Sequence, residues 1–402
     1  MRWTSSFSYL PIDYGIPLAR VEDQTQRVIF DNNLNGRKVR LHFSNRYSSK
    51  PLTLDRVSVG IVKDGRIENA CAVLLNGNPV IELGPGEECF SDELEYSVSA
   101  GEKIAVSTYV RDLQEIGSIC SFWSSVSASV TLSASGDYTS GGVFADYPAE
   151  EVYQIVRDDP NGGFFFYGFS GLQVLTDERV KTIAAFGDSI THMSYITSAL
   201  YKRLAAAYPG QVTLVNRGIG GNRVLYDATY SEDIVGNGRC FGTAGIKRFE
   251  QDVFGEEHVD AVLVLEGIND IMHPLQFGHP DQQVTADELI EGFRQYIETA
   301  HSHHARIYGA TITPSGNEEH PEEWRSAFET VRLETNDRIR SGIGYDGFFD
   351  YDEAVREPGR PAYMKEECHL GDGLHPNDAG GAIMAGRIDI DQIMRECGHD
   401  SN

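Results

Sequence analysis

Residues 261–265 read Ala-Val-Leu-Val-Leu, and this stretch decides the fold class. Five consecutive apolar side chains leave no polar face, which is typical of a parallel strand covered by helices on both sides. Apolar residues recur at helical spacing before it, in residues 243–254, and after it, in residues 285–301. A buried strand between two helices predicts alternating strands and helices around a parallel sheet.

The same alternation extends over the second half of the chain. We predict further strands at residues 181–186, 212–216, 306–310 and 348–350, and further helices at residues 195–207, 321–340 and 377–395. This order favours a doubly wound α/β sheet. Ligands of such sheets bind beyond the carboxyl ends of the strands, so the residues that follow each strand are the candidates for chemistry.

The first half of the chain has a different pattern. Apolar and polar residues alternate in short runs, at residues 39–43, 57–61 and 126–132. This period of two predicts strands with one buried face. Pairs suited to tight turns separate the runs, namely Asn35-Gly36, Asp64-Gly65 and Asn76-Gly77. We therefore expect an all-β sandwich of jelly-roll type over residues 1–175, without a long helix, and the α/β domain over residues 176–402.

Composition excludes several classes of partner. The formal net charge is −26, with a pI near 4.8, whereas binding to nucleic acid or to anionic membranes requires clustered Lys and Arg. No apolar run approaches the roughly 20 residues that span a bilayer. The first residues have no apolar stretch behind a basic start, so we expect no signal peptide and a cytoplasmic location. The six cysteines lie far apart and predict neither disulfides nor a zinc site.

Two of the four segments that follow predicted strands place small polar groups at the sheet edge. In Gly187-Asp188-Ser189-Ile190 the serine hydroxyl would lie at the carboxyl edge of the sheet, although Ser189 also suits the start of a helix. Residues 216–223 read Asn-Arg-Gly-Ile-Gly-Gly-Asn-Arg. Their glycines let a substrate oxygen approach a backbone N–H, while a plain turn stays open. The spacing does not match a nucleotide-binding loop.

The other two segments supply an amide and an imidazole. In residues 266–270, Glu-Gly-Ile-Asn-Asp, the side chain of Asn269 can donate to a developing oxyanion or form an Asx-turn. In residues 369–377 Asp372 precedes His375 by three positions, so its carboxylate can orient the imidazole. A metal site formed by His369, Asp372 and His375 is the rival interpretation.

Taken together and in this order, the segments GDSI, GIGGN, GIND and DGLHP resemble the four sequence blocks of the SGNH hydrolases, also called GDSL-type esterases and lipases. The resemblance covers about residues 180–396. It implies a flavodoxin-like parallel sheet, the SGNH hydrolase fold. It also implies Ser189 as nucleophile, His375 as general base and acid, and Asp372 as the carboxylate that orients His375.

The family resemblance further implies an oxyanion hole. Its donors would be the N–H of Ser189, the N–H of Gly221 and the side chain of Asn269, with Gly220 as the adjacent possibility for the glycine. Side chains near these groups are candidate substrate contacts, namely Asp188, His192, Asn222, Arg223 and Glu266. The reaction needs no cofactor and no metal.

A second resemblance concerns the substrate. Residues 36–45 with 51–54, and residues 264–270, are similar to a xylan-esterase-like branch of that family, which has an N-terminal β-domain. This implies a small-molecule or oligosaccharide ester as substrate. The polar, glycine-rich residues 227–238 favour short acyl groups, acetyl above all. The alternatives are a lysophospholipase or thioesterase, an inert carbohydrate-binding protein, and a metal-dependent hydrolase. Oligomeric state stays open.

Overall fold

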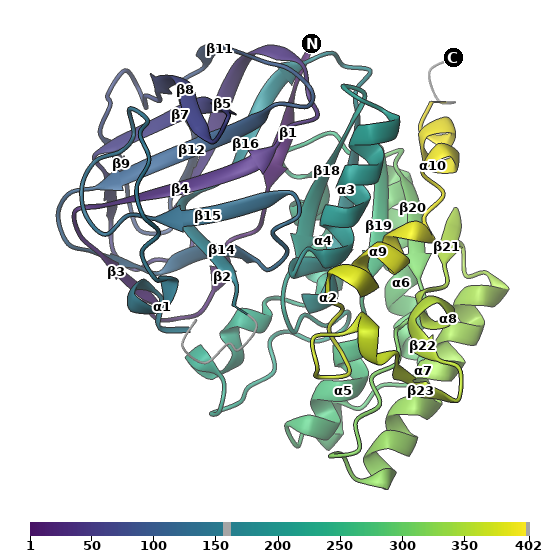
Figure 1. Cartoon of the computed structure of the whole chain (residues 1–402). Coiled ribbons are helices and arrows are strands. Elements are labelled where there is room, and N and C mark those ends of the chain that lie inside the picture. The colour runs from purple at the N-terminus through teal and green to yellow at the C-terminus, as the bar shows by residue number, and fades with distance from the viewer. Residues whose placement is uncertain (156–161, 399–402) are drawn as a thin grey trace. The chain divides into compact units, whose positions relative to one another are not determined.

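The computed structural model describes residues 1–155 and 162–398 (Figure 1). The chain divides into two compact units. The first holds residues 1–180 and 203–215, and the second holds residues 181–202 and those from 216 onward. Because neither unit is one continuous stretch, the predicted division of the sequence at residue 175 stays a prediction.

The first unit contains two large antiparallel sheets. One has the strand order β15 (Ala128–Leu132), β4 (Gln24–Asp31), β12 (Lys103–Val110), β7 (Arg56–Lys63) and β8 (Arg66–Ala72). The other has the order β10 (Glu88–Phe90), β5 (Gly36–Ser44), β16 (Phe164–Thr176), β14 (Ser118–Phe122) and β2 (Ile12–Asp13), with β1 (Arg2–Ser8) paired to β16 and β11 (Leu94–Val98) paired to β5. Smaller elements complete the unit: β3 (Ala19–Val21) with β13 (Gln114–Ile116), β6 (Leu52–Leu54) with β9 (Ile81–Leu83), and α1 (Ala149–Val152).

The two large sheets pack face to face. Phe7 of β1 stacks on Phe30 of β4 with ring centroids 4.4 Å apart, and both side chains are buried. The predicted β-sandwich is therefore confirmed. The turn at Asp64-Gly65 has the positive φ angles expected of a tight hairpin, and it joins β7 to β8. Asn35-Gly36 is different, because Gly36 already begins β5.

A five-stranded sheet forms the centre of the α/β part. Its order is β18 (Val212–Gly218), β17 (Lys181–Gly187), β19 (Ala261–Leu265), β20 (Arg306–Ala310) and β21 (Gly347–Phe349). The pairs from β17 through β21 are parallel. In chain order this is 2-1-3-4-5, the flavodoxin-like arrangement, so the predicted doubly wound sheet is confirmed.

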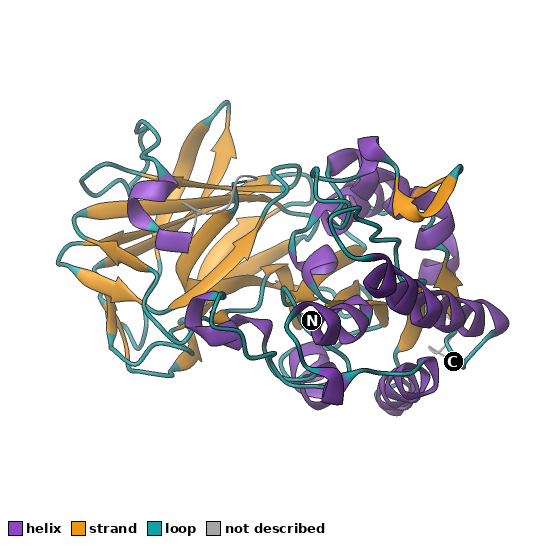
Figure 2. Cartoon of the chain, turned by 90° about the horizontal axis from the view of Figure 1, so that it is seen from below, coloured by secondary structure: helices purple, strands orange, loops and turns teal. Residues whose placement is uncertain are grey.

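Helices cover this sheet and carry the segments that leave its carboxyl edge (Figure 2). In chain order they are α2 (Ser189–His192), α3 (Tyr195–Ala207), α4 (Gly245–Phe254), α5 (Ile268–Gln276), α6 (Ala286–Ser302), α7 (Glu322–Ser341), α8 (Tyr351–Val355), α9 (Asp378–Gly386) and α10 (Ile390–Glu396). A short hairpin joins β22 (Arg356–Glu357) to β23 (Arg360–Met364), and three 3₁₀ turns lie at Val235–Phe241, Pro280–Gln282 and Glu366–Cys368.

Aromatic rings hold α4 and α6 against one face of the sheet. The ring of Phe186 in β17 meets Phe249 of α4 at 4.9 Å and Tyr296 of α6 at 5.4 Å between centroids, both edge to face. On the other face, Ala185 lines the same apolar gap as Ile196 and Leu200 of α3. The sheet is thus covered on both sides, as its apolar strands require.

One prediction about helices was wrong, and one helix was not predicted. The single helix expected at residues 377–395 is α9 and α10, because the chain turns at residues 387–389 and the side chain of Asp389 caps a new helix start at Gln392 N–H. Helix α5 was not predicted, and it contains Pro274. None of the helices in residues 1–155 and 162–398 combines the length and apolarity that crossing a bilayer requires.

Candidate active site

The end of β17 presents Ser189 at the carboxyl edge of the sheet. Asp188 is the N-cap of α2, and its carboxylate accepts the N–H of Ile190 at 3.0 Å. Ser189 is therefore the first residue of a helix, where a backbone N–H has no partner within the helix. Its N–H donates to no acceptor among the residues that the structure describes. The hydroxyl and this N–H both belong to the turn between strand and helix.

Ser189, His375 and Asp372 form one hydrogen-bonded chain. The Nε2 atom of His375 lies 2.8 Å from the Oγ of Ser189, and Nδ1 lies 2.6 Å from Oδ2 of Asp372. A carboxylate accepts, so Nδ1 carries a proton and Nε2 of the neutral ring accepts from the serine hydroxyl. This places a proton acceptor on the serine and a carboxylate behind the imidazole, the arrangement that nucleophilic catalysis by serine requires.

The turn before α9 holds Asp372 and His375 together. The Oδ1 atom of Asp372 accepts the N–H groups of Leu374 and His375, each at 3.0 Å. Burial raises the pKa of the Asp372 carboxyl, but the hydrogen bond and charge of His375 and these two N–H groups outweigh it, so the pKa lies well below its usual range. The carboxylate is therefore ionised at neutral pH and holds the ring in one orientation.

His369 stabilises the same turn from within. Its Nδ1 atom accepts the N–H of Gly371 at 2.9 Å and that of Gly373 at 3.1 Å. Both ring nitrogens of His375 are engaged, one by Ser189 and one by Asp372. These hydrogen bonds hold the turn so that His375 faces Ser189. In a metal site, His369, Asp372 and His375 would instead direct their ligand atoms at one common ion.

The glycine-rich segment after β18 lies beside Ser189. A Cβ atom built on Gly220 would be 3.9 Å from the Cβ of Ser189. The Gly220 N–H already donates to Nδ1 of His192 at 3.1 Å, whereas the Gly221 N–H has no acceptor within the described parts of the chain. Of the two glycines considered, Gly221 thus has the available donor. It has a φ of 73°, and a side chain there would collide with the ring of Phe241.

Asn269 brings the third segment against the second. Gly267, with a φ of 109°, lets the chain turn from β19 into α5, and Asn269 follows in the first turn of that helix. One hydrogen of its Nδ2 atom donates to the carbonyl of Asn222 at 3.0 Å, directly after Gly221. The second hydrogen has no acceptor in residues 1–155 or 162–398. The site thus offers uncharged donors from three segments.

The five candidate substrate contacts are all buried side chains. Asp188 and Asn222 have no exposed surface, and His192, Arg223 and Glu266 are 2 to 4% exposed. Asn222 donates to the carbonyls of Phe241 and Thr243. Arg223 donates to Gln282 and to the carbonyl of Asp227. Asp188 Oδ2, Arg223 Nε and Glu266 Oε1 have no hydrogen-bond partner among the described residues. Substrate contact by the five side chains therefore stays a prediction.

Glu266, in the same segment as Asn269, has a buried carboxyl group. Its Oε2 atom accepts from the hydroxyl of Tyr296 at 2.6 Å. Burial raises the pKa of Glu266 to about 7, although the charge of Arg248 and the Tyr296 bond lower it. Asp270 is also buried, and burial raises its pKa to about 6 despite N–H bonds from Val224 and Leu225. Both groups therefore titrate closer to neutrality than exposed carboxyls do.

Because the folded protein holds the Glu266 proton more tightly than the unfolded chain, the free energy of unfolding is expected to fall with rising pH. The contribution is complete below the ordinary pKa of 4.5 and is lost as the pH rises through about 7. The difference corresponds to about 3 kcal/mol. Glu266→Gln removes this titration, so the variant should lose less stability than the wild type in urea unfolding between about pH 4.5 and pH 8.

Equal pH dependence in the two proteins would contradict this prediction. Asp270 remains in both and shifts both curves in the same direction. Asp260, whose pKa is lowered to about 2, acts oppositely, since its contribution is lost only as the pH falls toward that value. It therefore does not affect the comparison between about pH 4.5 and pH 8.

Arg248 is a residue of the site region that the sequence analysis missed. It lies on α4 and is buried, together with Gly245, Phe249 and Val253. These positions recur at helical spacing and mark the face that packs on the sheet. The sequence did contain one signal for Arg248, namely an arginine on the buried face of a predicted helix. A charged side chain at a core position needs several buried partners.

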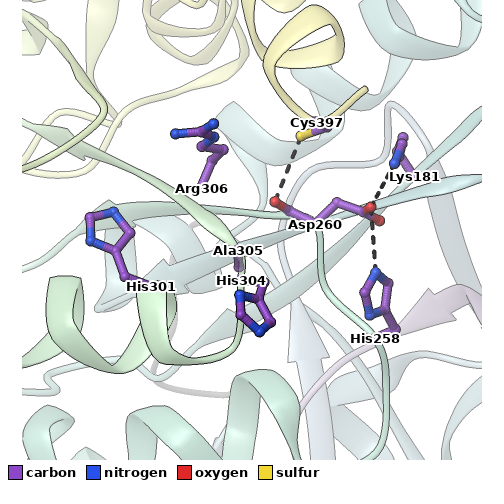
Figure 3. A pocket seen from close by; sticks show the side chains of 8 residues that line it. All are labelled: Lys181, His258, Asp260, His301, His304, Ala305, Arg306 and Cys397. Carbon is purple, nitrogen blue, oxygen red and sulfur yellow. Dashed lines mark hydrogen bonds and ion pairs between the residues drawn. The ribbon is translucent and has the colours of Figure 1, made fainter. Parts of the chain in front are cut away.

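A cavity of about 650 Å³ lies at the opposite edge of the sheet, where Lys181 begins β17 and Arg306 begins β20 (Figure 3). Its charges are paired. Lys181 lies 2.9 Å from Asp260, while Arg306 and His301 each lie 3.0 Å from Asp346. His301 is also in the last turn of α6, where a positive charge is stabilised by the helix dipole. These ion pairs give the basic side chains that line the cavity a structural role.

The sequence of the α/β part matches a known family. Residues 185–383 match the GDSL-like lipase/acylhydrolase family, and this range includes all four segments of the site. Residues 185–383 are a GDSL-like lipase/acylhydrolase domain. The resemblance to GDSL-type hydrolases is thereby confirmed, and the GDSL-like domain is an ester hydrolase in its general class.

Several solved structures are similar to a little more than half of the chain. An acetylxylan esterase from Geobacillus stearothermophilus is 21% identical, with a TM-score of 0.39, over 56% of this chain and 98% of that one. A GDSL-like lipase from Bacteroides thetaiotaomicron is 17% identical, with a TM-score of 0.38, over 54% and 88%. An alpha/beta hydrolase from the metagenome of Lake Arreo, Spain, is 20% identical, with a TM-score of 0.39, over 54% and 95%. The search of curated proteins found no match.

Proposed function

We propose that this protein is a serine esterase that hydrolyses short-chain esters, chiefly acetyl esters of carbohydrates, through an acyl-serine intermediate. The observation that carries the proposal is the hydrogen-bonded chain from Ser189 Oγ to His375 and on to Asp372, with distances of 2.8 and 2.6 Å. A serine hydroxyl is a weak nucleophile until a base within hydrogen-bond reach takes its proton.

In the proposed reaction the Oγ of Ser189 attacks the ester carbonyl carbon while Nε2 of His375 takes the hydroxyl proton. The tetrahedral intermediate then breaks its bond to the alcohol oxygen, and His375 gives the proton to that leaving group. In the second half His375 takes a proton from a water molecule, whose oxygen attacks the acyl carbon; the bond from that carbon to Ser189 Oγ then breaks, the carboxylic acid leaves, and His375 returns the proton to Oγ. Asp372 stays ionised throughout, because its pKa lies far below neutrality, and stabilises the imidazolium.

The proposed oxyanion hole consists of the N–H groups of Ser189 and Gly221 and the Nδ2 of Asn269. All three are uncharged donors fixed by backbone or by a hydrogen bond, so they need no reorganisation as negative charge develops. The support is that each retains a hydrogen without an acceptor in the described parts of the chain, whereas the Gly220 N–H does not.

We expect Asn269→Ala to lower kcat by about 10²–10³ with little change in KM, because the lost bond strengthens only in the transition state. The measurement is steady-state hydrolysis of p-nitrophenyl acetate. The control is Asn317→Ala, which changes an amide in the exposed turn before α7, where Asn317 Oδ1 accepts the N–H of Glu319. A loss in kcat of less than about threefold for Asn269→Ala would remove this side chain from the oxyanion hole.

The short acyl preference rests on the chain between Gly221 and α4. Its exposed side chains are mostly polar, among them Asp227, Glu232 and Asp233, with Tyr230 as an exposed aromatic. A long acyl chain needs an apolar trough to leave water. Hydrolysis rates of p-nitrophenyl esters are therefore expected to be highest for acetate and to fall with chain length. A maximum at eight carbons or more would favour the alternative, a lysophospholipase or thioesterase.

The carbohydrate part of the proposal rests on the resemblance of residues 36–45, 51–54 and 264–270 to the xylan-esterase-like branch. The decisive experiment measures acetate release from acetylated xylo-, manno- and gluco-oligosaccharides. We expect release from neutral sugars to exceed release from acetylated uronates, because a net charge of −26 repels anions. No release from any of these sugars, beside rapid hydrolysis of simple acetates, would contradict the carbohydrate assignment. Unchanged activity in EDTA is expected, since the proposed chemistry uses no metal.

A further inference from the structure

Arg248 hydrogen-bonds two of the four site segments and pairs with Glu266 of a third, all through one buried side chain. Its Nε atom donates to Oδ1 of Asn222 at 2.7 Å. One terminal nitrogen donates to the carbonyl of Arg217 at 2.9 Å and to Asp252 at 3.0 Å. The other donates to the carbonyl of Gly187 at 3.0 Å. The side chain is 5% exposed, so these bonds form away from solvent.

The arrangement uses the full geometry of a guanidinium group. Arginine has five N–H donors in a rigid plane, and here four of them reach oxygen acceptors. One terminal nitrogen also lies 3.7 Å from Oε1 of Glu266. The guanidinium carbon lies over the ring of Phe186, 4.0 Å from its centroid. Lysine has three donors at one point and cannot reach acceptors on separate segments in this way.

Two of these acceptors, the Gly187 carbonyl and the Asn222 side chain, lie next to proposed oxyanion donors in the chain. Gly187 is two residues before Ser189, the source of one N–H. Asn222 follows Gly221 directly, and its own carbonyl accepts from Asn269. The Asn222 side chain is otherwise bonded to the carbonyls of Phe241 and Thr243, so its position depends on internal contacts alone. Displacement of Arg248 would therefore move all three donors relative to one another.

We propose that Arg248 is a positioning residue, which fixes the spacing of the oxyanion hole by holding the Gly187 carbonyl and the Asn222 side chain on one rigid group. This inference rests on the proposed function. The inference assigns Arg248 no contact with the substrate. Arg248 acts through Asn222 on Gly221 and Asn269, and through the Gly187 carbonyl on the turn that carries Ser189.

The test compares Arg248→Met, which removes every donor at similar length, with Arg248→Lys, which keeps the charge and loses the fork. With p-nitrophenyl acetate we expect both variants to lower kcat by about 10²-fold and to change KM by less than about threefold. Full activity in Arg248→Lys would mean that charge alone matters and would overturn the proposal. The matched control is Arg294→Met, an exposed arginine on α6 paired with Glu291, which should retain wild-type rates.

A double-mutant cycle separates positioning from general structural damage. If Arg248 acts through the oxyanion hole, Asn269→Ala costs about 10²–10³ in the wild type but less than about tenfold in Arg248→Met, because the donor is already misplaced there. A merely structural role leaves the two penalties multiplicative, and that outcome overturns the proposal. Circular dichroism and urea unfolding monitor the fold of every variant.

Asn222→Ala provides the same test with a smaller perturbation and decides the matter if Arg248→Met does not fold. It removes the Oδ1 acceptor of Arg248 while keeping the Asn222 carbonyl that holds Asn269. A kcat loss with a reduced Asn269→Ala penalty supports the proposal, and multiplicative penalties overturn it. A wild-type protein without esterase activity contradicts the proposed function itself, whereas an active wild type with multiplicative penalties contradicts only the role of Arg248.

Discussion

Ser189→Ala is expected to lower the turnover of p-nitrophenyl acetate by on the order of 10⁶. The Oγ atom of Ser189 would form the acyl-enzyme. It lies 2.8 Å from Nε2 of His375, the imidazole nitrogen that would activate it. The fold should be unaffected, since the substitution removes one oxygen from the first residue of α2. Steady-state kinetics, circular dichroism and labelling by a fluorophosphonate probe measure the three effects.

The matched control is Ser302→Ala. Ser302 is exposed at the end of α6, and its hydroxyl donates to the carbonyl of Thr299. It should keep wild-type activity and labelling, while Ser189→Ala loses both. Wild-type-like turnover in Ser189→Ala would falsify the assignment of the nucleophile. A wild-type protein that does not react with the fluorophosphonate would point to an inert, carbohydrate-binding protein instead.

His375→Ala should reduce turnover by a similar factor, because members of such a catalytic chain act as a unit. In this variant the serine remains but lacks its base, so we expect the fluorophosphonate probe to label Ser189 slowly. Labelling should be absent only in Ser189→Ala. The difference between slow and absent labelling distinguishes loss of the base from loss of the nucleophile.

His303→Ala is the control for this experiment. His303 follows α6, and its imidazole contacts Glu250 at 2.9 Å. This position is far from the four segments of the candidate site in the sequence, and it precedes β20 rather than following a strand at the carboxyl edge of the sheet. It should retain wild-type kinetics. Labelling of Ser189 at the wild-type rate in His375→Ala would show that the imidazole does not activate the serine, and the proposed mechanism would then be wrong.

The sequence predicted the sheet because its strands are unambiguous. Residues 261–265 have apolar side chains on both faces, and no other element type of that length explains them. Three of the four segments of the candidate site were found for a related reason, since their residue types are unusual directly after buried strands. The fourth, residues 369–377, lies just before the last predicted helix and was found from the spacing of Asp372 and His375. The roles of Ser189, Asp372 and His375 stay predictions until variants are measured.

Burial of polar side chains was what the sequence did not reveal. Asp188 and Glu266 lie in the same segments as the proposed catalytic groups, so their position in the sequence favoured substrate contact. In the structure they have 0% and 2% exposure and bind protein partners. Arg248 was missed because its acceptors include two segments far apart from it in the chain, around Gly187 and at Arg217 and Asn222, and such convergence becomes visible only in three dimensions.

Asp372 and His375 belong to a single turn that also binds its own backbone through Asp372 Oδ1 and His369 Nδ1. The proposed general base and the carboxylate that orients it therefore leave the site together whenever this turn opens. Local opening events generally require less free energy than global unfolding. Mild urea should for this reason switch activity off in one step, ahead of the loss of helical signal, and hydrogen exchange at Leu374 and His375 should report the same transition.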